Sequence, residues 1–375
     1  MTEALGRAEA VIDTAGVAED IEAMLPSGVR SRQLCVRTLL VGILLALIDE
    51  RPGHLTRVHR ALLTLSDADR RRLGVLAQWR RGPHLLTYRQ VEHTFSLVCR
   101  ALSKDTPDGA PSDALCFVVD ALLEASVPGS VKEASSSLAV DWSDHETFSS
   151  PPITPGGKCA DKEAAWGHRR GGPAKGELFF GYYFQAATMV ADEGKAPVPE
   201  LVRRMVLGSC AHDAPPVLVP VLERLRASGV ALGDVLCDSG YAHRLATNWA
   251  LPVRRLGATL VMDLHPHDRG TRGTWKGAIC HNGNLYCPAT PPVLFCVEPL
   301  SRSASDVDTA AHDKRTTELA RYKLGRVSAT DEDGFHRVMC PAEMGKVRCP
   351  VKRASMLLPF DRPEIARPPE AAPTC

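Results

Sequence analysis

Apolar positions in the first hundred residues recur at intervals of three and four, the spacing of helices with one buried face. This pattern predicts a helix over about residues 31–50, capped by the serine that begins it. Ser66 can cap a shorter, arginine-rich helix, and Thr87 has capping-box spacing to Gln90 at the start of a third. Residues 1–110 are therefore predicted to form an all-helical region.

Beyond this region the period of the apolar pattern changes. Residues 104–113 are turn-rich and predict a linker, a helix is expected at about 113–126, and residues 111–135 are assigned to linker and helix. From residue 137 onward, short runs rich in β-branched and aromatic residues predict strands, with amphipathic segments between them. The expected strands are 137–142, 178–190 (one long strand or a hairpin), 201–207, 235–237 and 259–264, and the expected helices are 217–227 and 245–256.

Strands in succession, followed by strand–helix alternation, predict an α/β (α+β) core over residues 136–270, a mixed sheet with flanking helices. Residues 271–356 are rich in Gly, Pro and Cys and carry short strand-like runs, which predicts a small Cys-containing β insertion. Residues 357–375 hold too many prolines for a regular helix and are expected to form a disordered tail.

Charge is distributed unevenly along the 375 residues, although the net charge is only +1. Residues 51–100 contain ten Arg, no Lys and three acids, a local net charge of +7. Guanidinium groups bind phosphate with paired donors, so this cluster predicts DNA contact, whereas the alternative is a solvated helix surface. The expected DNA-binding residues of this cluster are Arg57, Arg60, Arg71, Arg72, Arg80, Arg81 and Arg89. Arg169, Arg170 and Lys175 in the core are candidate contacts to the DNA backbone, for which a solvated loop is the alternative.

Membrane and secreted classes are not favoured by the sequence. The longest apolar run, Leu39 to Ile48, is about half the ~20 residues that a bilayer span needs. The N-terminus lacks the basic start and apolar stretch of a signal peptide. We therefore expect a cytoplasmic, nucleoid-associated protein whose twelve cysteines are reduced thiols.

Two aspartates occupy matching places at the ends of short apolar runs. Asp141 follows Leu138-Ala-Val, and Asp238 follows Val235-Leu-Cys, 97 residues further on. A carboxylate at the end of a buried strand is held rigidly, where a metal ion or polar substrate can reach it. Two such carboxylates side by side can bind Mg²⁺, and paired metals promote in-line attack on phosphodiesters. An Asp after a strand is also a common turn residue, which is the alternative at each position.

The sequence segments around these aspartates resemble those of the DDE transposases of bacterial insertion sequences, broadly the IS4 superfamily. The matching segments are Asp161-Lys-Glu-Ala-Ala-Trp-Gly-His-Arg-Arg, then Phe180-Gly-Tyr-Tyr, and the Asp-x-Gly-Tyr motif Asp238-Ser-Gly-Tyr241. The resemblance covers roughly 135–270 and implies an RNase H-like core in which acids bind two Mg²⁺ (or Mn²⁺). It further implies that Asp141 bridges both ions, that Asp238 binds one, and that the partner is DNA at insertion-sequence ends, with a homodimer left open.

The third acid of that family, a Glu on a helix, has no good match. Glu318 lies in a helical segment, but the order of the surrounding residues differs from the family pattern. The simplest interpretation is a transposase truncated before the final helix, with weak activity or none. The alternative function is a non-catalytic DNA-binding remnant or an inhibitor of an intact transposase.

Two zinc hypotheses compete for other residues. Cys280, Cys287, Cys340 and Cys349 form two pairs that can hold a structural Zn²⁺, although their spacings are wider than usual, and plain thiols are the favoured interpretation. The His265-Pro-His267 sequence after a predicted strand is a zinc-hydrolase arrangement, but regular βα repeats do not follow it. A loop at the edge of the core is the favoured interpretation there.

Overall fold

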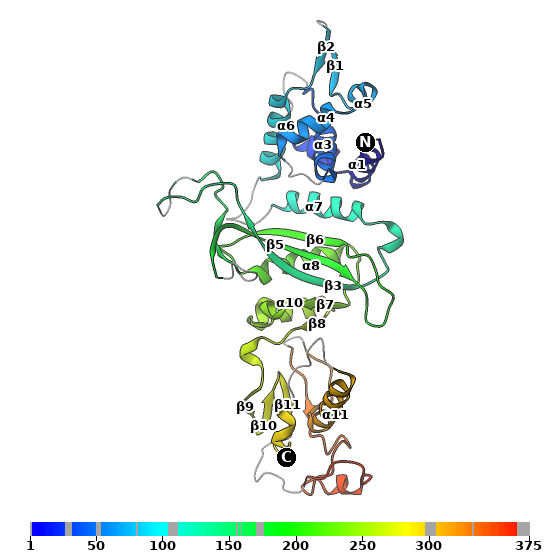
Figure 1. The fold of residues 1–375 in the computed structure, drawn as a ribbon, viewed down its shortest axis with the longest axis vertical. Coiled ribbons are helices and arrows are strands. Elements are labelled where there is room, and N and C mark those ends of the chain that lie inside the picture. The colour runs from blue at the N-terminus through cyan, green and yellow to red at the C-terminus, as the bar shows by residue number, and fades with distance from the viewer. Residues whose placement is uncertain are drawn as a thin grey trace. The chain divides into compact units, whose positions relative to one another are not determined.

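The computed structural model describes residues 2–26, 32–49, 54–79, 82–103, 112–154, 157, 159–169, 176–296, 305–331 and 334–365. Within these ranges the chain is mixed α/β, with eleven α-helices and a curled mixed sheet, which confirms the predicted class at that level (Figure 1). The chain divides into two compact units. Unit 1 comprises Met1–Leu236 and Leu256–Thr259, and unit 2 comprises Cys237–Arg255 and Leu260–Cys375.

The N-terminal part of unit 1 is built from helices around an apolar core. Residues such as Ile12, Ile21, Leu39 and Leu62 are almost completely buried there and hold the helices together. The helices are α1 (Thr2–Ala15), α2 (Val17–Met24), α3 (Val36–Ile48), α4 (Leu55–Leu63), α5 (Asp67–Arg72) and α6 (Tyr88–Leu102).

Two predicted helix starts in this part are confirmed. The hydroxyl of Ser66 accepts from the amide of Asp69 at 3.1 Å and caps α5. Thr87 and Gln90 form a capping box at the start of α6. The predicted helix over 31–50 is α3, which begins later than expected, and its predicted cap Ser31 lies outside the described residues.

The prediction that residues 1–110 are all-helical is wrong at one place. Strands β1 (Leu76–Trp79) and β2 (Gly82–Leu85) form an antiparallel hairpin between α5 and α6. Gly82 has φ +112°, a conformation that glycine adopts easily, and the ring of Trp79 packs on His84 with centroids 4.2 Å apart. A four-residue strand on each side of a turn is too short to produce a clear alternating pattern in the sequence.

The central sheet has the strand order β4-β5-β3-β7-β8, and β6 also pairs with β5. Strand β5 is one continuous strand and is antiparallel to β3, β4 and β6. β4 pairs with residues 178–181 of β5 and β6 with residues 182–188, so both lie along the same edge of β5. The strands are β3 (Ser137–Glu146), β4 (Ala165–His168), β5 (Leu178–Val190), β6 (Val202–Ser209), β7 (Asp234–Cys237) and β8 (Thr259–Met262).

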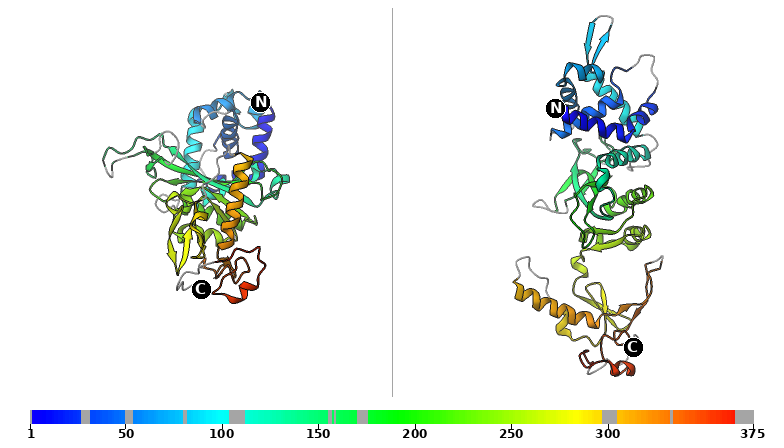
Figure 2. Two further views of the ribbon diagram at one scale, coloured as in Figure 1. Left: turned by 60° about the horizontal axis from the view of Figure 1, so that its bottom comes forward. Right: turned by 90° about the vertical axis from the view of Figure 1, so that its right-hand side faces the viewer.

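One face of this sheet is better covered than the other. Along β5, odd-numbered side chains from Phe179 to Met189 are buried, whereas the even-numbered ones are half-buried. Helices α7 (Asp113–Ser126) and α8 (Ala214–Ala227) both contact β6, and α7 also contacts α1 and α2 (Figures 1 and 2). Helix α7 therefore connects the N-terminal helices to the sheet within unit 1.

Unit 2 contains a second, smaller sheet and a long helix. The expected helix at 245–256 is only partly helical, because a short 3₁₀ turn (Ala246–Asn248) precedes α10. The segment predicted as a β insertion also contains the 17-residue helix α11, and an apolar cluster joins α11 to β11. The elements are α9 (Ser239–Ala242), α10 (Ala250–Arg255), β9 (Thr271–Trp275), β10 (Ala278–His281), β11 (Asn284–Tyr286), α11 (Asp306–Tyr322), β12 (Gly325–Arg326) and β13 (Val338–Met339).

Candidate functional site

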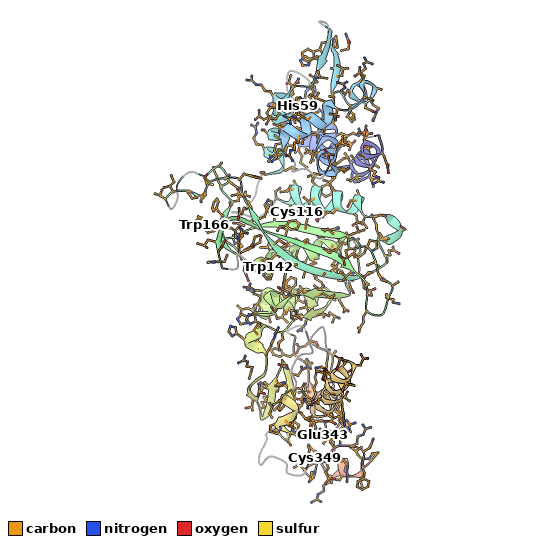
Figure 3. The ribbon with its side chains drawn as sticks, in the orientation of Figure 1. His59, Cys116, Trp142, Trp166, Glu343 and Cys349 are labelled. Atoms are coloured by element: carbon orange, nitrogen blue, oxygen red, sulfur yellow. The ribbon has the colours of Figure 1, made fainter. Side chains whose placement is uncertain are left out.

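Asp141 lies on β3, on the less covered face of the sheet. It pairs with Ala186 of β5, and its neighbour Trp142, labelled in Figure 3, pairs with the fully buried Gln185. Because side chains alternate along a strand, Asp141 and Trp142 project from opposite faces. The Asp141 side chain is exposed, and its Oδ1 accepts from the Trp142 amide at 2.7 Å. The strand therefore presents this carboxylate rigidly toward solvent.

The start of β3 is fixed by a second carboxylate, Asp192, just after β5. Its Oδ1 accepts hydrogen bonds from the hydroxyl groups of Ser135 (2.8 Å) and Ser137 (2.7 Å) and from the amides of Ser136 (3.1 Å) and Ser137 (3.0 Å). These donors, led by the Ser137 hydroxyl, lower the pKa of Asp192 to about 2. Asp192 stays ionised and holds the first residues of β3 against the end of β5.

The same serines contact the start of β7. The Gly233 amide donates to the Ser136 carbonyl at 2.9 Å, and the next amide, that of Asp234, donates to the Ser137 hydroxyl at 3.3 Å. These two contacts place the first residues of β3 and β7 side by side, as neighbouring strands of the sheet. All of these contacts lie inside unit 1.

Asp238 follows β7 and caps the short helix α9. Its Oδ1 accepts from the Gly240 amide at 2.8 Å, and its side chain is exposed. Tyr241 is 1% exposed and packs on the equally buried Trp249, with ring centroids 4.8 Å apart. In the Asp-x-Gly-Tyr motif the tyrosine thus anchors the turn, and the aspartate has a structural role as a cap.

The neighbouring Cys237 is a packing residue. Burial raises the pKa of the Cys237 thiol to about 12, so that it is neutral at physiological pH. A neutral thiol is a poor nucleophile, so Cys237 contributes packing at the end of β7.

Glu318, the candidate third acid, lies half-buried on α11 in unit 2. Its neighbour Leu319 and the nearby Tyr322 belong to the apolar cluster of that unit, and the pKa of Tyr322 is raised by burial first and also by the Glu318 charge. Asp141 belongs to unit 1, whereas Asp238 and Glu318 belong to unit 2. β3 leads to Asp141 and β7 leads to Asp238, and the first residues of these two strands lie side by side. This contact does not fix the positions of the three carboxylates relative to one another.

The predicted DNA-binding arginines of the N-terminal region fall into two groups. Arg60, Arg71 and Arg89 are exposed and Arg57 is half-buried, and none of the four forms an ion pair in the part of the chain that the structure describes. Arg72 differs, because it pairs with Glu9 (2.9 Å) and Asp69 (3.1 Å). Arg80 and Arg81 lie outside the described residues.

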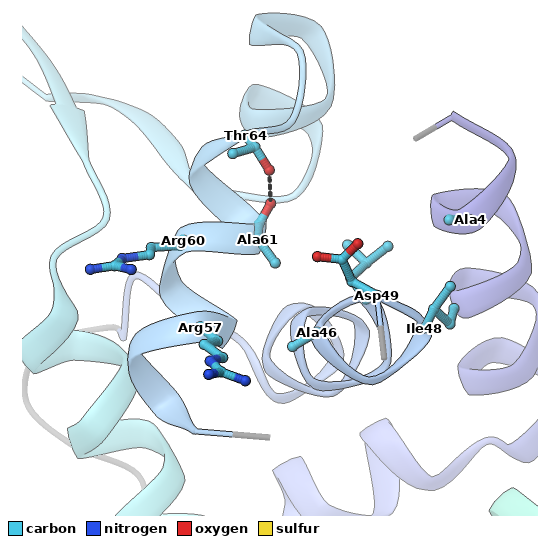
Figure 4. Close-up of a pocket in the computed structure, with 9 residues that line it drawn as sticks. Ala4, Ala46, Ile48, Asp49, Arg57, Arg60, Ala61 and Thr64 are labelled. Atoms are coloured by element: carbon cyan, nitrogen blue, oxygen red, sulfur yellow. Dashed lines mark hydrogen bonds between the residues drawn. The ribbon is translucent and has the colours of Figure 1, made fainter. Parts of the chain in front are cut away.

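Arg57 and Arg60 also line a cavity of about 520 Å³ among α1, α3 and α4 (Figure 4). The remaining wall is mostly apolar, with one acid, Asp49. The lining residues are Ala4, Leu45, Ala46, Ile48, Asp49, Arg57, Arg60, Ala61 and Thr64. The sequence did not indicate this cavity, and it contains none of the predicted catalytic acids.

The core cations are only partly described. Arg169 pairs with Asp144 (3.6 Å) and Glu146 at the end of β3, and its guanidinium lies over the ring of Phe179. These contacts occupy Arg169 within unit 1, so it is less available to phosphate than predicted. Arg170 and Lys175 lie outside the described residues.

The structure does not bring the four predicted zinc cysteines together as ligands. Cys349, labelled in Figure 3, and Cys287 are buried in the apolar cluster of unit 2. Cys340 packs against that cluster, and Cys280 lies on β10. Only one group of three or more His, Cys, Asp or Glu side chains converges among the described residues, and it contains no cysteine. Apolar packing accounts for the positions of Cys287, Cys340 and Cys349.

That converging group is His243, His265 and Asp268, whose ligand atoms all lie within 4.8 Å of one another. The sequence drew attention to His265 and His267 but gave no reason to add His243, which lies 22 residues earlier at the end of α9. The pKa of His265 is lowered by burial and by the neighbouring His243 and His267. A neutral imidazole has one lone pair, and in His265 it lies on Nδ1, which accepts from the His267 amide (3.2 Å), so a metal ion bound there would replace that hydrogen bond.

The chain matches no protein-family model, no curated protein and no solved structure. Among the described residues, no helix combines the length and the apolar character that crossing a membrane requires. The resemblance to DDE transposases therefore stays a hypothesis that rests on the residues themselves.

Proposed function

We propose that this chain is a transposase-like DNA-processing protein whose sheet carries a divalent-metal site formed by Asp141 and Asp238. The observation that carries the proposal is the hydrogen bond from the Gly233 amide to the Ser136 carbonyl (2.9 Å). In the sequence, each aspartate is the fifth residue beyond that bond, Asp141 after Ser136 and Asp238 after Gly233.

This placement supports the chemistry that the resemblance implies. The first acid lies on β3, between the antiparallel β5 and β7 in the order of the sheet, and the second acid follows β7, a placement that supports the proposed RNase H-like core. Carboxylate oxygens suit Mg²⁺ or Mn²⁺, which would supply Lewis-acid activation of phosphodiester chemistry. Asp192 positions Asp141 by fixing the start of β3.

The third acid limits the expected rate. Glu318 is the candidate, on a regular helix of unit 2. With only two carboxylates a metal pair loses charge and geometry, so we expect slow strand nicking and little strand transfer. Substitution Glu318→Gln should slow nicking further if this residue is a metal ligand, and should leave it unchanged if it only packs on α11.

A second function, DNA binding without chemistry, is favoured by Arg60, Arg71 and Arg89 on the N-terminal helices, which form no ion pair with any residue that the structure describes. The exposed Trp79 beside the hairpin turn adds an aromatic surface to the same region. Such a protein would occupy insertion-sequence ends or compete with an active transposase.

Nicking of supercoiled plasmid in Mn²⁺ separates the two functions. The proposal expects slow nicking that disappears in Asp141→Asn and Asp238→Asn, while both variants still bind DNA. Asp144→Asn is the matched control, because Asp144 lies on the same strand but pairs with Arg169. DNA binding without any metal-dependent nicking would leave only the binding function, and absence of DNA binding would contradict both.

A further inference from the structure

A turn and a loop of unit 2 place imidazole and carboxylate groups together at its surface. His243 Nδ1 lies 3.9 Å from Asp268 Oδ2, and the rings of His243 and His265 stack with centroids 4.1 Å apart. The ring of His267 lies 5.0 Å from that of His265. None of these residues takes part in the proposed phosphoryl-transfer site.

The backbone holds this cluster in place without a ligand. His243 follows α9, which is anchored by the buried Tyr241. His265 begins a 3₁₀ turn in which its Nδ1 accepts from the His267 amide (3.2 Å) and its carbonyl accepts from the Asp268 amide (2.8 Å). A site whose backbone is already ordered loses less entropy when it binds a ligand.

We infer that His243, His265 and Asp268 form a binding site for a divalent transition metal, with Zn²⁺ as its ligand. Two imidazoles and one carboxylate suit Zn²⁺, whereas Mg²⁺ prefers oxygen ligands alone. Zinc bonds of about 2.0–2.1 Å in a tetrahedral site put donor atoms roughly 3.3 Å apart, which is closer than the 4.8 Å limit of this cluster. The side chains of His243 and Asp268 are 59% and 50% exposed, so they can rotate inward, and water takes the fourth position.

Coordination has a structural consequence for the neighbouring turn. The metal joins the turn after β7, which begins at Asp238, to the loop after β8. It would fix the end of α9, five residues beyond Asp238. The site is chemically different from the proposed Mg²⁺ or Mn²⁺ site, and its existence does not depend on that proposal.

The test is calorimetric titration of the chelator-stripped full chain with Zn²⁺ under reducing conditions. Relative to the unchanged chain, the Zn²⁺ affinity of one site should fall by about 100-fold or more in His265→Ala and by at least about 10-fold in Asp268→Asn. Removing a metal ligand is expected to lower the affinity at least as much as removing an outer-sphere partner does. His336→Ala is the matched control, since His336 is an exposed histidine of the same unit, and it should bind Zn²⁺ normally. Millimolar Mg²⁺ should not displace the bound Zn²⁺.

Several cysteines can also bind zinc, so the site is tested by the difference in Zn²⁺ binding between the variants and the unchanged chain, and not by the total amount of Zn²⁺ bound. Equal Zn²⁺ affinity and stoichiometry in the unchanged chain, His265→Ala and Asp268→Asn would overturn the site. If circular dichroism shows that His265→Ala does not fold, the titration of Asp268→Asn, which changes an exposed residue, is the test of the site. As a second measurement, Zn²⁺ should shift the amide resonance of His267, because that amide contacts the His265 ring. An unshifted His267 amide at saturating Zn²⁺ would count equally against it.

Discussion

The interior beneath β6 and the surface of the N-terminal helices use the same residue, arginine, in opposite ways. Arg203 and Arg204 are only 2% and 3% exposed, and they lie within ion-pair distance of Asp120 and Glu124 from α7. Arg60 and Arg71, by contrast, are exposed and form no ion pair within the described ranges. An arginine that is buried and ion-paired therefore has a structural role, whereas an exposed arginine without an ion pair is available to a polyanion such as DNA. The number of arginines in a region does not distinguish the two.

The physical reason is the cost of desolvation. A guanidinium removed from water must be matched by carboxylates and carbonyls, and Arg203 accordingly also donates to the Lys132 carbonyl at 3.1 Å. An exposed guanidinium keeps its hydration, which it exchanges for phosphate at little cost. The following predictions test whether the two regions really differ in this way.

The largest effect on stability is expected at Glu124. Glu124→Ala leaves Arg203 and Arg204 buried with one acid fewer, which should lower the free energy of unfolding by about 3 kcal/mol. Denaturant unfolding measures the change, and the exposed Glu133→Ala is the control. A loss below about 0.5 kcal/mol would show that the buried cations do not depend on this partner.

A smaller loss is expected at Asp192, where charged hydrogen bonds hold the start of β3. Asp192→Asn should lower the free energy of unfolding by about 1–2 kcal/mol. The pKa of Asp192 falls from an ordinary 3.8 to about 2 on folding, so its stabilisation is complete above the ordinary value and is lost as the pH drops toward 2.

Acid unfolding followed by circular dichroism checks the sign. Between pH 4 and 2 the unchanged chain should lose stability more steeply than Asp192→Asn, because the amide does not titrate. Parallel acid profiles for the two chains would contradict the assignment of this carboxylate.

Arg72 is the intermediate case, exposed but paired with Glu9 and Asp69. Arg72→Ala should lower the free energy of unfolding by about 0.5–1 kcal/mol, as expected for a surface ion-pair network. It should change the salt dependence of DNA binding little, since its charge is already neutralised. A large drop in the salt slope would place Arg72 with the DNA-binding group instead.

The smallest effect on stability is expected for the unpaired arginines. The triple variant Arg60→Ala, Arg71→Ala and Arg89→Ala should unfold within about 0.5 kcal/mol of the unchanged chain. Each phosphate contact contributes about 0.9 to the slope of log affinity against log salt, so the slope should fall by up to about 2.7. An unchanged slope would remove the DNA assignment from this surface.

Local sequence signals predicted much of this fold. The Ser66 cap, the capping box at Thr87 and the long β5 strand all depend on neighbouring residues, and the structure contains each of them. The hairpin β1–β2 was missed because its strands are too short to show a period.

The ion network and the histidine cluster required tertiary information. Arg203 contacts Glu124, which is 79 residues away in the sequence, and His243 contacts Asp268, with a helix and a strand between them in the chain. No regular spacing in the sequence connects either pair. Tertiary structure also adds apolar packing around Cys287, Cys340 and Cys349, and ion pairs to Arg169.

Mn²⁺ binding to the full chain, with one equivalent of Zn²⁺ present to fill the histidine site, tests the central proposal most directly. If the two aspartates share one site, Asp141→Asn and Asp238→Asn should each lower the affinity for the same Mn²⁺ ion by at least about tenfold. The double variant should then bind Mn²⁺ only slightly more weakly than either single variant. Asp144→Asn should bind Mn²⁺ normally. Unchanged binding in both single variants, or losses that add in the double variant, would contradict a metal centre built by these two aspartates.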